Sequence, residues 1–216
     1  MSERIWLGFF TALTLACRTA LASTAQIEVT DAGGRPLSET VVVLSPESSA
    51  APAPASALPA ESIIDQRHET FLPLVTLIRE GGHVIFTNND ATMHQVYSFS
   101  DIRQFAFEID EGQRSQPVTF EKPGVAAIGC NIHDQMITYV YVASQPFGAV
   151  SDRSGHATIV NVAEGRYRGS AWHPGLAPGT PGRAFELVVT ATGGRARVVL
   201  PVVVGSARTA KHMQMY

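Results

Sequence analysis

The chain of 216 residues is 45% hydrophobic and 16% charged, a balance typical of a folded globular protein rather than a disordered one. Its length allows one or two domains with a hydrophobic core. Its formal net charge of −3 offers no basic surface to a phosphate backbone, which excludes nucleic acid as an expected partner.

The first 22 residues have the parts of a secretory signal peptide. An arginine precedes an apolar run over residues 5–17, and Ala20-Leu21-Ala22 supplies the small residues of a cleavage site. A membrane anchor is one alternative, but the run is shorter than the roughly 20 apolar residues that span a bilayer. Lipid attachment at Cys17 is another. We expect cleavage after Ala22, a periplasmic or secreted protein, and no membrane span once the signal is removed.

Removal of the signal changes the cysteine count and the charge. It leaves Cys130 as the single cysteine and an excess of four acidic residues over basic ones. A secreted protein with one cysteine forms no internal disulfide. The Cys130 thiol is therefore buried and inert, paired with another chain, or a metal ligand.

Short strand-like segments make up the first two thirds of the mature chain. Residues 25–44 predict two strands joined by a turn at Asp31-Ala32-Gly33-Gly34, and residues 45–62, rich in Ala, Pro and Ser, predict a loop. Further strands are predicted at 71–79, 83–88, 94–99, 105–109, 116–120, 125–130 and 137–142. Short strands at this spacing, with almost no helical periodicity, predict an all-β sandwich.

The pattern changes after residue 146. Strands are predicted at 157–162, 167–172, 185–192 and 195–204, and Gly193-Gly194 predicts a hairpin between the last two. We expect the following division of the chain: signal peptide 1–22, main domain 23–146 with the loop 45–62, smaller β-sandwich region 147–206, and tail 207–216.

Candidate metal ligands gather at the end of one predicted strand. Cys130, His133 and Met136 follow one another within seven residues, and His94 begins another predicted strand 36 residues upstream of Cys130. Two histidines and a cysteine with a weak axial methionine are the ligands of blue-copper sites, whereas zinc rarely uses methionine. Ligand type therefore favours copper as the cofactor.

The same residues resemble the cupredoxin family. The Cys-x₂-His-x₂-Met loop has the short spacing of amicyanin, and Glu80 to Asn88 resembles the strand before the first histidine ligand. Lys122-Pro123-Gly124 resembles the approach to the cysteine. The resemblance covers about residues 71–142. It implies a cupredoxin Greek-key β-sandwich in which His94, Cys130, His133 and Met136 bind type 1 copper.

A narrower resemblance is to bacterial cupredoxin-like proteins labelled as methylamine-utilisation proteins. It rests on Cys130 to Asp134 with Met136, and on His94 to Ser100. In such proteins the segment 158–174 resembles a transthyretin-like or carboxypeptidase-regulatory-like β-sandwich. That likeness implies the smaller C-terminal sandwich.

Several residues near the predicted ligands depart from the family or have ordinary roles. Gln95 follows His94 where many cupredoxins have an asparagine that ties the ligand loops together. Ile132 and Asp134 flank His133, where many have a proline before or after the second histidine. Met93 is expected in the core. Four other histidines are expected to be structural or exposed: His68, His83, His156 and His173.

These features predict a periplasmic electron carrier whose partners are redox proteins. The sequence holds no nucleophile motif, paired carboxylates or phosphate-binding loop, so we expect no enzyme activity and assign no catalytic residue. Two alternatives remain: a copper carrier or sensor that does not cycle electrons, and a metal-free binding module that retains only the fold.

Overall fold

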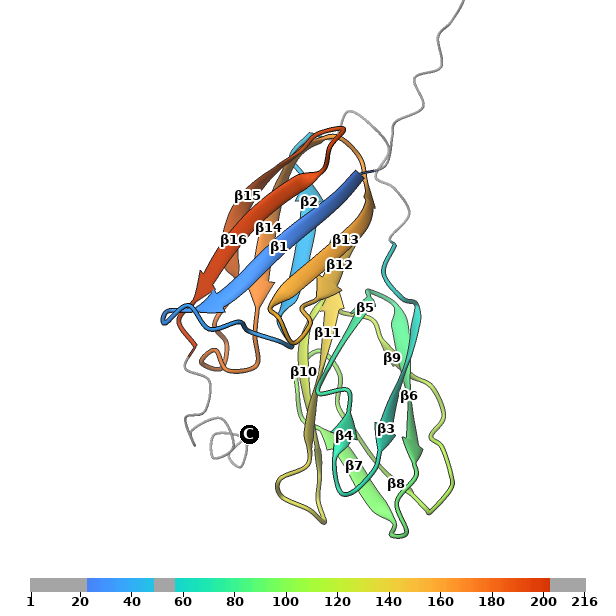
Figure 1. Cartoon of the computed structure of the whole chain (residues 1–216). Helices are drawn as coiled ribbons and strands as arrows, with labels where there is room; N and C mark the ends of the chain where they lie inside the picture. Colours follow the sequence, from blue (N-terminus) through green and yellow to red (C-terminus); the bar gives the residue numbers. More distant parts are fainter. Residues whose placement is uncertain (1–22, 49–56, 203–216) are drawn as a thin grey trace, which may run out of the picture.

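The computed structural model describes residues 23–48 and 57–202, and these residues form two β-sandwiches without a helix (Figure 1). The central sandwich is built from β3 to β11, and the flanking sandwich from β1, β2 and β12 to β16. The prediction of an all-β protein is confirmed. Within the described ranges, no helix is long and apolar enough to cross a membrane.

The central sandwich packs two sheets around one core. One sheet has the order β5-β11-β10-β7-β8 and the other β4-β3-β6-β9. The strand bounds are β3 (Glu61–Gln66), β4 (Phe71–Leu72), β5 (Val75–Arg79), β6 (Gly82–Asn88), β7 (His94–Ser98), β8 (Phe105–Ile109), β9 (Val118–Phe120), β10 (Gly124–Cys130) and β11 (Ile137–Ala143). Every second residue of β6 is buried, which places Val84 and Phe86 in the core and Asn88 at its end.

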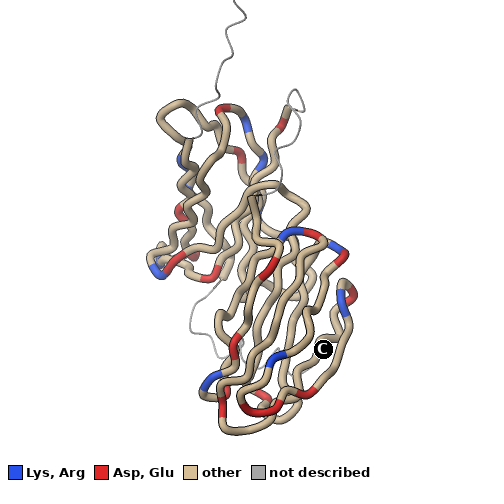
Figure 2. The backbone as a smooth tube through the Cα atoms, turned by 90° about the vertical axis from the view of Figure 1, so that its right-hand side faces the viewer, with Lys and Arg blue, Asp and Glu red and all other residues tan. Residues whose placement is uncertain are grey.

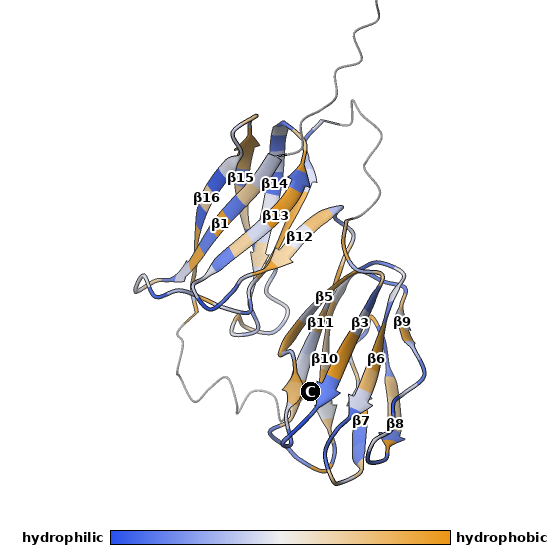
Figure 3. Ribbon diagram, turned by 45° about the vertical axis from the view of Figure 1, so that its right-hand side comes forward, coloured by the Kyte–Doolittle hydropathy of each residue, from blue (hydrophilic) through white to orange (hydrophobic). Residues whose placement is uncertain are grey.

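The flanking sandwich combines the first two strands with the last five. Its sheets have the orders β13-β1-β16 and β12-β2-β14-β15. The strand bounds are β1 (Ser23–Asp31), β2 (Val41–Pro46), β12 (Phe147–Val150), β13 (His156–Val162), β14 (Gly165–Trp172), β15 (Arg183–Val189) and β16 (Gly194–Leu200). Hydrophilic and hydrophobic residues alternate along β1, β13 and β16 (Figure 3), as expected for strands with one buried face.

The predicted domain division at residue 146 is wrong for the N-terminal strands. β1 and β2 belong to the flanking sandwich and not to the domain that holds the candidate ligands. β1 pairs in parallel with β16 and antiparallel with β13, so its buried Ile27 and Val29 complete the flanking core. The predicted β1–β2 hairpin is also absent, because the two strands lie in opposite sheets.

Two other segments differ from the sequence prediction. β3 begins at the end of the predicted loop 45–62 and continues beyond it to Gln66. It pairs in parallel with β6. The predicted strand 71–79 is divided into β4 and β5 around Pro73. The predicted signal peptide and tail 207–216 lie outside the described residues.

A third cluster of buried residues joins the two sandwiches. All four residues from Val41 to Leu44 in β2 are buried, because Val42 and Leu44 face the flanking core whereas Val41 and Val43 face the central sandwich. The Trp172 ring of β14 packs against two tyrosine rings of β11. The distance between ring centroids is 5.7 Å to Tyr139 and 5.8 Å to Tyr141. The two sandwiches therefore share apolar contacts beyond their covalent links.

His173 makes the stability of the flanking sandwich depend on pH. Its Nδ1 accepts a hydrogen bond of 2.8 Å from the Gly175 amide, and burial lowers the pKa of the imidazole to about 4, against the opposing effect of a backbone hydrogen bond to Ser38. The unfolded chain, with a histidine pKa near 6.5, binds more protons between these values. Stability therefore falls as the pH drops from 6.5 towards 4.

We expect this histidine to account for about 2–3 kcal/mol of that loss. Urea unfolding of the metal-free protein across this pH range measures it. His173→Asn keeps an acceptor for the Gly175 amide but does not titrate, so its unfolding free energy should decline less steeply than that of the wild type. Equal pH slopes would show that His173 is not the group responsible.

Candidate metal centre

The candidate site lies at the end of the central sandwich farthest from the flanking sandwich, where the loop between β10 and β11 is found (Figure 1). His94 begins β7 and Cys130 ends β10, and these strands are antiparallel neighbours with Cys130 opposite Val96. Gly129 leaves room for the Tyr97 ring of the neighbouring strand, because a Cβ there would lie 2.9 Å from the end of that ring. The pairing brings Cys130 Sγ to 3.6 Å from His94 Nδ1.

The loop after Cys130 adds the second histidine. The Met136 amide donates a hydrogen bond of 2.9 Å to the His133 carbonyl, which folds the loop back on itself. One ligand atom each of His94, Cys130 and His133 then lies within 4.8 Å of the other two. The structure thus brings three of the four predicted ligand side chains together, and their binding of a metal stays a prediction.

Met136, the fourth predicted ligand, is 2% exposed and belongs to the same core cluster as Cys130. Its thioether is therefore held on the apolar side of the loop. Met136 would supply the soft, weak fourth ligand of a copper site if its sulfur reaches the group formed by His94, Cys130 and His133.

His94 is fixed by a carboxylate on its outer nitrogen. The ring is fully buried, and Nε2 lies 2.9 Å from Asp90 Oδ2. Burial raises the pKa of Asp90, but the hydrogen bonds from the Glu69 amide, His94 and the His68 amide outweigh it and hold the pKa below its usual value. Asp90 is therefore an acceptor, which places a proton on His94 Nε2 and leaves Nδ1 free to face Cys130.

His133 has a similar arrangement nearer the surface. Its Nε2 lies 3.5 Å from Glu69 Oε1, and its side chain is 18% exposed. Its Nδ1 is buried and has no hydrogen-bond partner within the described residues. A buried nitrogen without a partner is costly in a folded protein, and a metal ion at the site would supply one.

The donor set fits a metal ion of the copper or zinc size. Two ligands with bonds of roughly 2.0–2.3 Å and an angle between tetrahedral and trigonal lie about 3.5–3.8 Å apart. The separation of 3.6 Å between Cys130 Sγ and His94 Nδ1 agrees with that geometry. One thiolate, two imidazoles and a buried thioether favour copper over zinc.

Gln95 connects the strand that carries His94 to the loop after Cys130. Its Oε1 accepts a hydrogen bond of 2.7 Å from Asn131 Nδ2, and its carbonyl accepts one of 3.0 Å from the Asn131 amide. These bonds connect the strand that carries His94 with the loop that carries His133. The departure at Gln95 is therefore compatible with a formed site.

The remaining histidines of the described chain lie outside this group. His83 Nε2 contacts Glu61 Oε2 at 2.8 Å, and His83 is the second residue of β6, at the opposite end of that strand from Asn88. Met93 was expected in the core but is 37% exposed, because it lies in the loop before β7 rather than in a strand.

Sequence reasoning missed the residues that support the ligands. Asn88 is buried at the end of β6, and its amide group bonds to the Thr92 and Ile109 carbonyls and the Asp90 amide at 2.8–2.9 Å. Asp90 and Glu69 contact the two histidines. The sequence contains one indication of these supporting residues, which is the position of Asp90 four residues before His94.

Comparisons with known proteins find similarity in structure alone. No family model and no curated protein matches the sequence. A purple cupredoxin from Nitrosopumilus maritimus is 24% identical with a TM-score of 0.35, and the match covers 38% of this chain and 99% of that one. Amicyanin from Paracoccus versutus is 21% identical with a TM-score of 0.34, covering 46% of this chain and 97% of that one.

A third similar structure is a Cu-containing nitrite reductase from Thermus scotoductus. It is 24% identical with a TM-score of 0.36, and the match covers 45% of this chain but 25% of the reductase. Because each match covers less than half of this chain, the assignment of the metal centre depends on the chain's own residues.

Proposed function

We propose that the mature protein is a periplasmic or secreted type 1 copper protein of the cupredoxin class, which carries single electrons between redox proteins. The convergence of His94, Cys130 and His133 within 4.8 Å carries this proposal. Both imidazoles have their outer nitrogen against a carboxylate, which leaves each Nδ1 available to a metal.

A bound copper ion supplies a one-electron couple, and the mixture of thiolate and imidazole ligands suits both of its oxidation states. The buried His94 and Cys130 exclude water from the inner side of the site. The partly exposed ring of His133 offers the shortest route from the site to a partner. Met136, buried behind the loop, is the proposed axial ligand.

The proposed carrier has no substrate to bind, and we assign no catalytic residue. Secretion rests on the signal-like sequence of the first 22 residues. The partners are redox proteins that dock at the loop end of the central sandwich, where His133 approaches the surface.

Copper retention through repeated redox cycles tests this function against copper delivery. We expect the loaded protein to keep its ion in both oxidation states in the presence of a competing chelator, and to exchange electrons reversibly with a soluble mediator. Rapid loss of Cu(I) to the chelator would favour a copper carrier. Failure to bind copper in either state would leave a metal-free binding module.

A further inference from the structure

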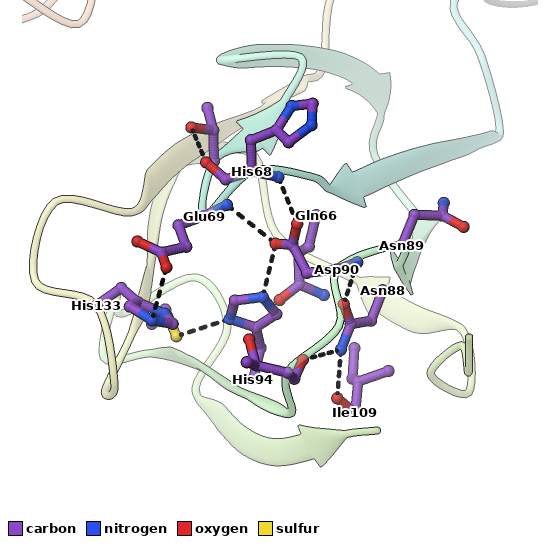
Figure 4. Close-up of polar contacts among 12 residues, drawn as sticks. Gln66, His68, Glu69, Asn88, Asn89, Asp90, His94, Ile109 and His133 are labelled. Atoms are coloured by element: carbon purple, nitrogen blue, oxygen red, sulfur yellow. Dashed lines mark hydrogen bonds and ion pairs between the residues drawn. The ribbon is translucent and has the colours of Figure 1, made fainter. Parts of the chain in front are cut away.

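Asp90 joins one of the candidate ligands to a turn that comes from another part of the chain (Figure 4). Its Oδ2 accepts hydrogen bonds from His94 Nε2 at 2.9 Å and from the Glu69 amide at 3.0 Å. Its Oδ1 accepts a hydrogen bond from the His68 amide. One side chain, 10% exposed, thus holds three donors.

The turn that Asp90 holds has an unusual backbone. It links β3 to β4, and Arg67 and Thr70 exchange backbone hydrogen bonds of 3.0 and 3.2 Å. Between them His68 and Glu69 have φ angles of 54° and 53°. Two successive left-handed residues make a type I′ turn, for which asparagine and glycine are preferred. Non-glycine residues are strained in this conformation, and the Asp90 carboxylate offsets part of that strain by accepting both amides.

The turn directs Glu69 towards the second histidine. The Asp90 side chain fixes the backbone of the turn. The Glu69 side chain then points towards His133, and its Oε1 lies 3.5 Å from His133 Nε2 (Figure 4). Glu69 is 52% exposed, so the contact depends on the backbone beneath it rather than on surrounding packing. Asp90 thus contacts the first imidazole directly and is connected to the second through the turn and Glu69.

We infer that Asp90 is a positioning residue for both histidines, directly for His94 and through the 67–70 turn and Glu69 for His133. This inference rests on the proposed copper function. A carboxylate on the outer nitrogen of a ligand histidine makes the ring a better donor and fixes its orientation. A better donor favours Cu(II) over Cu(I), so the Asp90–Glu69 pair lowers the reduction potential.

Charge removal at Asp90 tests the direct effect. Asparagine offers one acceptor oxygen where aspartate offers two, so Asp90→Asn cannot accept from His94 and from both amides of the turn. We expect binding of Cu(II) relative to Cu(I) to weaken about tenfold, which raises the reduction potential by about 59 mV. Asp90→Glu, which keeps the charge, should recover part of the shift. An unchanged potential in Asp90→Asn would overturn the inference.

A double-mutant cycle tests the indirect effect. Glu69→Gln alone should raise the potential less than Asp90→Asn, because its contact is longer and more exposed. In the Asp90→Asn background it should have no further effect, since the turn no longer presents residue 69 to His133. Additive shifts would show that the two carboxylates act independently.

Asp152 provides a matched control in the flanking sandwich. It also accepts two backbone amides in a turn beside a histidine, from Ser154 at 2.8 Å and His156 at 3.0 Å. Asp152→Asn should leave the potential and the copper spectrum unchanged. A shift as large as that of Asp90→Asn would attribute the effect to general destabilisation.

The histidine tautomers of the metal-free wild type decide the positioning role independently of copper. Long-range proton–nitrogen NMR should find His94 with its proton on Nε2 and in slow exchange with water. A proton on Nδ1 would overturn the inference even if copper binds. If copper does not bind but the Nε2 proton is found, the proposed function fails and the positioning of His94 stands.

Discussion

Replacing Cys130 with serine is expected to abolish the visible thiolate-to-copper absorption of the loaded protein while leaving a folded β-protein. The thiolate is the source of that band and the softest ligand of the site, whereas a hydroxyl oxygen is a poor ligand for Cu(I). Serine has nearly the same shape, so the buried position at the end of β10 tolerates it. Absorption spectra with equal copper loading, together with circular dichroism, measure both effects.

His83→Ala is the control for this prediction. His83 lies at the start of β6 and pairs with Glu61 at 2.8 Å, away from the candidate ligands. Its removal should leave the copper spectrum unchanged. A spectrum altered in His83→Ala, or retained in Cys130→Ser, would overturn the ligand assignment.

Replacing Asn88 with alanine is expected to cost about 3 kcal/mol of unfolding free energy and to weaken copper binding. The side chain is 1% exposed and satisfies the Asp90 amide and the carbonyls of Thr92 and Ile109. Alanine leaves these backbone groups without a partner and releases the loop that leads into His94. Urea unfolding of the metal-free protein measures the first effect, and copper titration measures the second.

Asn89 is the matched control, because it is the same residue type one position later. Its Nδ2 contacts Asp65 Oδ1 at 2.6 Å on the surface. Asn89→Ala should change the unfolding free energy by no more than about 0.5 kcal/mol. Equal losses in the two variants would mean that the buried amide network around Asn88 does not stabilise the loop.

Much of the strand content could be predicted because alternation of apolar residues reports directly on burial. The predicted bounds for 105–109 coincide with β8, and those for β7, β10 and β11 differ by one residue at an end. β3 was missed because Ile63 and Ile64 are its only large apolar residues, and Ile63 is exposed. Too few residues of that strand face the core to produce an alternation of apolar and polar residues.

Pairing between distant strands could not be predicted in the same way. The alternation in β1 reveals which of its faces is buried but not which strand lies beside it. Its parallel partner β16 begins at Gly194, at the other end of the chain. The assignment of residues 23–146 to one domain failed for that reason, although the strands themselves were identified.

The ligand motif could be predicted because it is local in the sequence, whereas the residues that support it come from distant segments. Cys130, His133 and Met136 are close in the sequence, so their spacing identifies the site. The contact between Glu69 and His133 depends on two left-handed residues in a short turn and on the side chain of Asp90. The sequence of residues 67–70 does not predict this turn, because asparagine and glycine, its usual residues, are absent.

The visible absorption spectrum of the purified mature protein, recorded after Cu(II) loading and again after ascorbate, tests the central claim most directly. We expect an intense thiolate-to-copper band that bleaches on reduction and returns on oxidation, because the ligand atoms of Cys130, His94 and His133 lie within 4.8 Å of one another. A protein that binds Cu(II) without such a band, or whose band does not return, would contradict the assignment of a redox-active copper centre to these residues.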